Sequence, residues 1–97
     1  MNYKSAQWQR KRAKILWRDG YRCQLSRRYG KNVEATTVHH IFPADAFPEY
    51  AWADWNLLSL SAGAHDKMHA RNTGELTKAG KDLLWATARR RGMTVDP

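Results

Sequence analysis

Apolar side chains recur at helical spacing near both ends of the chain, with charged side chains between them. This pattern predicts a first helix over residues 5–18, with Ser5 as its N-cap and an outer face rich in Arg and Lys. It also predicts a C-terminal helix over residues 77–92, capped by Thr77. The apolar side chains expected to face the interior are Trp8, Ile15 and Leu16 in the first helix, and Leu83 and Leu84 in the second.

Between these helices the chain changes to β-branched, aromatic and turn-forming residues. Residues 21–26 (YRCQLS) and 35–42 (ATTVHHIF) are predicted to be strands, joined by a turn-prone segment into a possible hairpin. Residues 43–55 contain two prolines and four aromatic side chains and have no regular period. We expect this segment to be an aromatic loop folded over the core.

A second strand-like pattern follows the aromatic loop. Residues 56–61 (NLLSLS) predict a short apolar strand. Residues 62–72 (AGAHDKMHARN) predict a helix of about three turns, with Ser61 as its cap and Gly74 as its stop. Strands grouped between helices predict an α+β fold.

Composition indicates one small domain. The chain has 97 residues, of which 42% are hydrophobic and 27% charged, so a single domain over residues 1–97 is expected. The single cysteine, Cys23, excludes an intrachain disulfide and is expected to be a small buried apolar residue. No run approaches the ~18 apolar residues of a membrane span, and the N-terminus has no apolar signal segment. We therefore expect a cytoplasmic protein with no membrane partner.

The net charge of +8 is concentrated at the two ends of the chain. Residues 1–31 carry ten Lys or Arg against one acid, whereas residues 32–66 carry five acids and no Lys or Arg. Residues 67–97 carry seven bases and three acids. A basic frame around a weakly acidic centre favours binding of a polyanion by the ends. A solubilising charged surface explains the same composition, so charge alone leaves nucleic-acid binding open.

All four histidines fall into two pairs, His39 with His40 and His65 with His69. His65 and His69 are four residues apart in a predicted helix, which places their rings on one face at a metal-chelating spacing. A surface helix with two histidines by chance explains that pair as well. The other pair lies where a strand enters a proline-containing loop, a common place for functional side chains. Two half-exposed strand histidines are the alternative there.

Neighbouring strand side chains point to opposite faces, so His39 and His40 cannot easily bind one ligand together. The economical arrangement places one on a metal and turns the other toward a substrate held by that metal. If His39 joins His65 and His69, the ion has three imidazole ligands and open positions. His40 is then a candidate general base, because an ordinary histidine pKa of about 6.5 leaves much of it neutral near pH 7. Asn56 is the candidate for orienting that ring, although a turn-forming Asn explains it equally.

Three motifs resemble the HNH endonuclease family, whose active site is the ββα-metal (His-Me finger) motif. They are HHIFP at residues 39–43, NLLSL at 56–60 and HDKMH at 65–69. The upstream segment ILWRDGYRCQLS resembles the usual entry segment of the family, so the likeness covers about residues 8–72. The resemblance implies a ββα-metal core at about residues 33–73, flanked by an N-terminal and a C-terminal helix.

Carried over by position, the resemblance makes His39 and His65 metal ligands and His40 the general base. Asn56 becomes the residue that orients the base or its loop. His69 resembles the second helical histidine of the colicin-type branch, which also faces the metal. The resemblance implies hydrolysis of phosphodiester bonds in DNA with one divalent metal, which leaves a 5′-phosphate and a 3′-hydroxyl. The metal stabilises charge on the phosphate and the departing 3′ oxygen while water activated by the base attacks.

Two departures from the family pattern concern metals. Many members carry Asp where His39 stands, and an imidazole-rich ligand set suits Zn²⁺, Ni²⁺, Co²⁺ or Mn²⁺ better than Mg²⁺. Many members also hold a structural zinc with two C-x-x-C pairs, whereas this chain has only Cys23, so a four-cysteine zinc is excluded. The expected cofactor is one divalent ion from the set Zn, Ni, Mn, Co and Mg.

DNA is expected to be held mainly through its phosphates, with little sequence reading, because the sequence contains no recognisable base-reading module. The candidate contacts are Arg10, Lys11, Arg12, Lys14, Arg27 and Arg28, with Lys67 and Arg71 beside the metal helix. Simple solvent exposure is the alternative explanation for each of these side chains.

The leading hypothesis is a metal-dependent DNA endonuclease or nickase of low sequence specificity. The alternative is a non-catalytic nucleic-acid-binding module in which the four histidines close a structural zinc, and a third reading is an RNase or toxin-like nuclease. Small stand-alone HNH proteins are common in phages, where many act beside the terminase. The resemblance therefore implies terminase or another phage protein as a partner, in a bacterial or phage-infected cell. We expect a monomer or a weak dimer, since a double-strand cut needs two sites.

Overall fold

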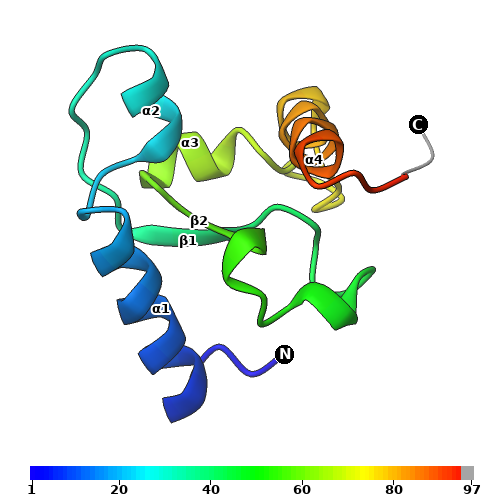
Figure 1. Cartoon of the computed structure of the whole chain (residues 1–97), viewed down its shortest axis with the longest axis horizontal. Helices are drawn as coiled ribbons and strands as arrows, with labels where there is room; N and C mark the ends of the chain where they lie inside the picture. The colour runs from blue at the N-terminus through cyan, green and yellow to red at the C-terminus, as the bar shows by residue number, and fades with distance from the viewer. Residues whose placement is uncertain (95–97) are drawn as a thin grey trace.

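A two-stranded antiparallel sheet lies at the centre of the fold, with helices around it (Figure 1). The computed structural model describes residues 1–94, so residues 95–97 of the expected domain lie outside the described part. The elements in chain order are α1 (Ala6–Arg18), α2 (Gln24–Arg28), β1 (Thr37–His40), the short 3-10 helices η1 (Pro48–Tyr50) and η2 (Asp54–Asn56), β2 (Leu57–Leu60), α3 (Ala62–Asp66) and α4 (Lys78–Arg90). This order confirms the α+β class, with β1, β2 and α3 forming the ββα unit. No helix within residues 1–94 is long and apolar enough to cross a membrane.

The first predicted helix is confirmed as α1. The Ser5 hydroxyl caps it by accepting a hydrogen bond from the Trp8 backbone N–H at 3.1 Å. The buried side chains are those that the helical spacing predicted, Trp8, Ile15 and Leu16. They pack against Val38 of β1 and Leu57 of β2, so the apolar face of α1 covers one side of the sheet.

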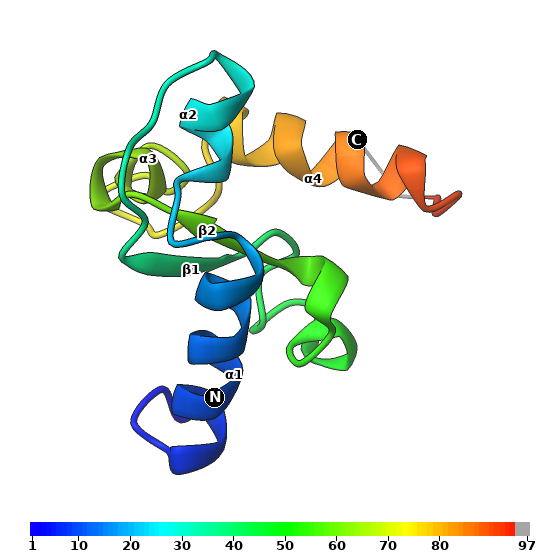
Figure 2. The ribbon, with the colours of Figure 1, turned by 60° about the vertical axis from the view of Figure 1, so that its left-hand side comes forward.

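Helices cover both faces of the small sheet. Figure 2 shows α1 on one side of the strands, and α2, α3 and α4 on the other. The second side holds the larger core cluster, which consists of Cys23, Ile41, Phe42, Leu60, Met68, Leu83, Leu84 and Ala88. Cys23 is fully buried in this cluster, as expected. Each strand therefore presents alternate side chains to two different packed layers.

The predicted strand at residues 21–26 is wrong. Arg22 makes one isolated antiparallel bridge to Glu34, and the residues after it form α2. Gly20 and Tyr21 have φ values of 64° and 58°, so the chain turns sharply here instead of continuing extended. Gln, Leu and Arg are good helix formers, which favours α2 once the chain has turned. The strand that pairs with β1 is β2, from across the aromatic loop.

The aromatic loop between β1 and β2 folds over the core as expected. Phe42 is buried at its base, and three aromatic rings surround it in edge-on contacts. The centroid distances from Phe42 are 5.1 Å to Phe47, 5.5 Å to Tyr50 and 5.7 Å to Trp55. Two 3-10 helices shape the loop and return the chain to β2. This packing joins the two strands without a tight hairpin turn.

The predicted helix over residues 62–72 is too long. Ser61 caps α3 as expected, but the helix ends at Asp66 after five residues. His69 lies beyond the helix and forms an isolated antiparallel bridge with Leu76. His65 and His69 are therefore not two positions on one helix face.

A tight return of the chain over residues 68–77 replaces the missing helical turns. The backbone N–H of Thr77 donates to the Met68 carbonyl at 2.9 Å, and Gly74 adopts a φ of 72° at the turn. Gly80 of α4 packs against this segment, where an added Cβ would lie 2.6 Å from the Met68 carbonyl oxygen. Packing of residues 68–77 against α4 is therefore favoured over a longer α3.

The C-terminal helix is confirmed as α4. The Thr77 hydroxyl caps it by accepting from the Gly80 N–H at 3.3 Å. Leu83 and Leu84 are buried as predicted. This helix closes the core on the side of the sheet opposite to α1.

Candidate active site

Strand alternation sends the two adjacent histidines to opposite sides of β1. His40 stacks on Trp8 of α1, with ring centroids 5.3 Å apart and an interplanar angle of 18°. His39 points to the other side, where its ring lies 5.4 Å from the ring of His65. The two side chains therefore belong to different environments although they are neighbours in sequence.

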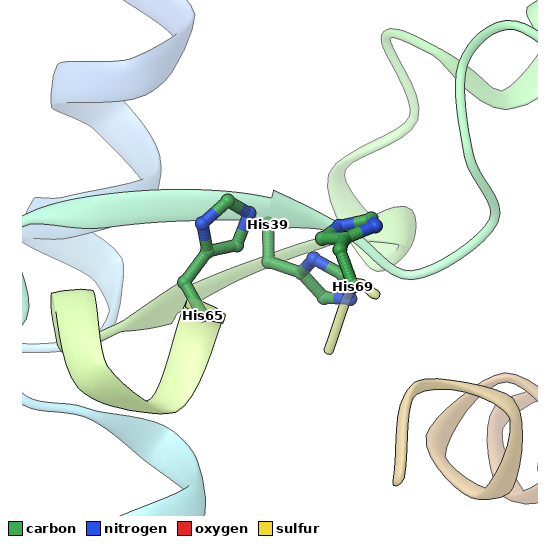
Figure 3. Close-up of side chains that lie close together, drawn as sticks. All are labelled: His39, His65 and His69. Atoms are coloured by element: carbon green, nitrogen blue, oxygen red, sulfur yellow. The ribbon is translucent and has the colours of Figure 1, made fainter. Parts of the chain in front are cut away.

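His39, His65 and His69 form a compact cluster (Figure 3). Their ring centroids are 5.3 to 5.4 Å apart, and one nitrogen from each ring can be chosen so that all three lie within 4.8 Å of one another. His39 comes from β1, His65 from α3 and His69 from the segment after α3. The predicted grouping of these three residues is present, but His69 reaches it through a chain reversal instead of the expected helical spacing.

The cluster presents unprotonated nitrogens. His39 is fully buried, and neither of its ring nitrogens has a hydrogen-bond partner in the structure. Burial first, and then the nearby His65, His69 and His40, lower the pKa of His39 to about 3. Burial and the neighbouring His69 also lower the pKa of His65. These two imidazoles are therefore neutral near pH 7 and offer lone pairs.

His69 is oriented by a backbone carbonyl. Its Nδ1 lies 3.1 Å from the carbonyl oxygen of Gly74, which can only accept, so Nδ1 carries the proton. Nε2 is then the nitrogen with a free lone pair. Metal-binding histidines usually donate their other N–H to a carbonyl or carboxylate in this way.

The donor set fits a divalent metal ion. An imidazole buried without hydrogen bonds is costly, and a cation bound at one nitrogen removes part of that cost. Three imidazole ligands match the preference of Zn²⁺ and related transition metals. Three protein ligands also leave coordination positions for water or substrate.

His40 has the features of a neutral base. Its side chain is almost fully buried, and its Nε2 lies 3.0 Å from the Ala51 carbonyl oxygen, to which it donates. This bond leaves the lone pair on Nδ1. Burial is the largest effect on its pKa and lowers it, against smaller raising effects from the Ala51 bond and Asp45. A neutral ring with one free nitrogen can accept a proton near pH 7.

Asn56 holds the aromatic loop and makes no hydrogen bond to His40. Its Oδ1 accepts from the Phe42 N–H at 2.7 Å, and its Nδ2 donates to the Phe42 carbonyl at 3.1 Å and the Tyr50 carbonyl at 3.0 Å. Tyr50 immediately precedes Ala51, whose carbonyl holds His40. Of the two expected modes of action, this geometry fits orientation of the loop.

One cavity brings the two histidine environments together. It has a volume of about 510 Å³, and its walls include both His40 and the three clustered histidines. Arg12 and Asp45 also line it. The wall of one cavity therefore includes both the candidate base and the candidate metal cluster.

The eight basic residues predicted to bind DNA occupy different settings. Arg12 lines the cavity and donates to the Thr36 carbonyl at 2.6 Å. Arg71 lines a smaller hollow of about 250 Å³ next to His65 and His69. The other basic residues in the set lie outside the cavity walls and are Arg10, Lys11, Lys14, Arg27, Arg28 and Lys67.

Two of these lysines are paired with an acid. Lys11 and Lys14 both contact the Asp54 carboxylate, and their hydrogen bonds lower the pKa of that carboxyl to about 2. Arg27 and Arg28 are exposed in the last turn of α2, and Lys67 is exposed at the end of α3. The part of the predicted set that directly faces the histidines is therefore small.

Three further contributions to the site were missed by sequence reasoning. The carbonyls of Ala51 and Gly74 orient two of the histidines, and the indole of Trp8 covers the face of His40. No residue type could signal the carbonyls, because every residue has one. Trp8 was predicted only as a core residue.

Comparison with known proteins identifies a structural relative. The chain is similar to the HNH endonuclease of the deep-sea thermophilic bacteriophage GVE2, whose crystal structure was solved with a manganese ion. The two share 28% sequence identity at a TM-score of 0.66, over 92% of this chain and 79% of that one. No family model and no curated protein sequence matches the chain. The histidine motifs, the ββα order and this likeness together support the resemblance of the chain to the HNH endonuclease family.

Proposed function

We propose that this nuclease hydrolyses phosphodiester bonds in DNA with low sequence specificity, using His40 as the general base. Its cofactor is one divalent metal ion, for which we propose His39, His65 and His69 as ligands. The observation that carries the proposal is the cavity, whose walls hold both a neutral imidazole with a free nitrogen and a cluster of three imidazoles.

The base acts through Nδ1 of His40. Because Nε2–H donates to the Ala51 carbonyl, Nδ1 is the nitrogen that accepts a proton from the attacking water. The Ala51 carbonyl remains a hydrogen-bond acceptor for the imidazolium that results. The negative charge of Asp45, which already acts to raise the pKa of His40, also favours that imidazolium.

The three clustered histidines hold the cation and leave room for the substrate. When bound, a divalent ion supplies positive charge that stabilises the phosphate and the departing 3′ oxygen. We propose Mn²⁺, Zn²⁺, Ni²⁺ or Co²⁺ ahead of Mg²⁺, because all three protein ligands are nitrogen atoms.

We propose that DNA is gripped unequally by the basic residues. Arg12 and Arg71 line hollows whose walls also include the histidines, and they are assigned to the phosphates around the cut. The exposed cations Arg10, Arg27, Arg28 and Lys67 are assigned to flanking phosphates. Lys11 and Lys14 share the charge of Asp54 and contribute less.

The alternative of a structural zinc closed by four histidines is not favoured. His40 is held by Ala51 and Trp8 on the other side of β1, away from the three clustered rings. Bringing all four rings onto one tetrahedral ion would require β1 to rearrange.

Plasmid cleavage tests the proposal directly. Supercoiled DNA is incubated with the protein and Mn²⁺, Ni²⁺, Zn²⁺, Co²⁺ or Mg²⁺, beside single-stranded DNA and RNA. We expect cleavage of DNA that a chelator abolishes, and the nicked or linear product separates nickase from double-strand activity. Absence of cleavage with every metal would refute the enzymatic proposal, and preferential cleavage of RNA would refute the assignment of DNA.

We also propose that residues 1–97 form one domain with its ββα-metal core at about residues 33–73. Terminase or another phage protein is the proposed partner, in the cytoplasm of a bacterial or phage-infected cell. The proposed oligomeric state is a monomer or a weak dimer, which sedimentation in the presence and absence of DNA will distinguish.

A further inference from the structure

The ring of His40 is enclosed by aromatic side chains of the N-terminal segment. Trp8 stacks on it at 5.3 Å and 18°, and Tyr3 approaches it edge-on at 6.1 Å and 66°. Tyr3 also packs edge-on against Trp8 at 5.4 Å, and Trp52 of the aromatic loop does the same at 5.9 Å. The indole of Trp8 is therefore at the centre of this group, in contact with each of its members.

The hydrogen bond from His40 to Ala51 restrains one side of the ring. The imidazole turns about its Cβ–Cγ bond, and Nδ1 lies further from that axis than Nε2. A given rotation therefore moves Nδ1 further than the nitrogen that the hydrogen bond holds. A proton acceptor must be held within hydrogen-bond reach of its water, so a second contact that limits this rotation keeps Nδ1 in place.

A stacked indole provides that contact. Rotating the imidazole out of its plane drives a ring edge into the face of Trp8, which is only 4% exposed and cannot easily withdraw. Trp8 is itself held at its backbone by the Ser5 cap of α1 and at its ring by Trp52. The contact is parallel and planar, so its restraint depends on a flat side chain and not merely on filled volume.

We propose that Trp8 is a positioning residue for the general base, which it holds by stacking so that Nδ1 of His40 keeps its direction. This role rests on the proposed function of His40. It extends the active site to α1, an element that lies outside the proposed ββα core.

The test compares a flat with a flexible replacement. Trp8→Phe keeps an aromatic face, whereas Trp8→Met fills similar space without one. Trp85→Met is the control, because Trp85 of α4 is a partly buried tryptophan that packs against the other core cluster. We expect Trp8→Met to lower kcat about 10- to 100-fold with little change in KM or Mn²⁺ affinity, because a misdirected base slows only the chemical step. Trp8→Phe should recover most of kcat, and Trp85→Met should keep it.

A second measurement removes folding from the comparison. In a His40→Ala background, Trp8→Met should leave the residual rate unchanged, since its effect passes through the missing ring. An equal kcat for Trp8→Met and the wild type would overturn the proposal, as would a Trp8→Met effect of the same size without His40. Full activity of His40→Ala alone would instead refute the proposed function.

Discussion

Replacement of Asn56 by alanine is predicted to destabilise the protein strongly and to disorganise the aromatic loop. The side chain is fully buried and makes three hydrogen bonds, all to backbone groups of the loop. Alanine leaves the N–H and the carbonyl of Phe42 buried without partners, while water can reach the Tyr50 carbonyl more easily. Each unsatisfied buried group costs about 1–3 kcal/mol.

Two such groups and a small cavity give a loss of about 3–5 kcal/mol in the free energy of unfolding. A domain of this size has roughly 5–15 kcal/mol in total, so the variant should be folded only marginally. Urea unfolding followed by circular dichroism in metal-free buffer measures the loss. A decrease below about 1 kcal/mol would refute the assignment of Asn56 as the main tie of the loop.

Asn56→Asp is the matched variant, because it has nearly the same size and keeps the acceptor for the Phe42 N–H. Its second oxygen faces the two carbonyls that now receive hydrogen bonds from Nδ2. We expect a comparable loss of stability at pH 7, partly recovered at acid pH where a protonated carboxyl can donate again. Equal stability of Asn56→Asp and the wild type at pH 7 would show that the two donated bonds contribute little.

Three further predictions concern the histidines and the basic residues. His40→Ala should lower kcat about 10²- to 10⁴-fold while calorimetric Mn²⁺ affinity stays unchanged, and lost metal binding would contradict the division between the two histidines. In chelator, His39 has a folded-state pKa of about 3, below its unfolded value, so the unfolded chain takes up the proton first. The contribution of His39 to stability is therefore full above about pH 6.5 and falls as the pH is lowered, by about 2 kcal/mol at pH 5 in urea titrations. His39→Leu should reduce the slope and leave a smaller one, because the pKa values of His40 and His65 are also lowered in the folded protein. Arg12→Gln should weaken DNA binding and its salt dependence more than Lys14→Gln, which loses a charge already shared with Asp54, and equal effects in anisotropy titrations would contradict this ranking.

Local patterns in the sequence determined the elements that are stabilised by residues only a few positions apart in the chain. Helix α1 is capped by Ser5 and buries Trp8 because capping and apolar spacing act within a few residues. The opposite directions of His39 and His40 follow from strand alternation alone. The histidine motifs also carried the resemblance to the HNH endonucleases, since metal ligands and a base require particular residue types.

The pairing of distant segments was decided only by the tertiary structure. Residues 21–26 have strand-like composition, but β1 pairs with β2, and the sharp turn at Tyr21 leaves them free to form a helix. His69 joins its partners because the chain reverses after Asp66 and packs on α4, which no local pattern encodes.

The orientation of the site residues depends equally on distant contacts. Backbone carbonyls have no sequence signature, so the bonds that His40 donates to Ala51 and His69 donates to Gly74 exist only once the loops are placed. Asn56 was identified from its motif, yet its action through the loop follows from its three backbone partners. The sequence by itself thus determined which side chains are candidates for the chemistry. Long-range packing decided how each is held, because the fold must first bring together both partners of those contacts.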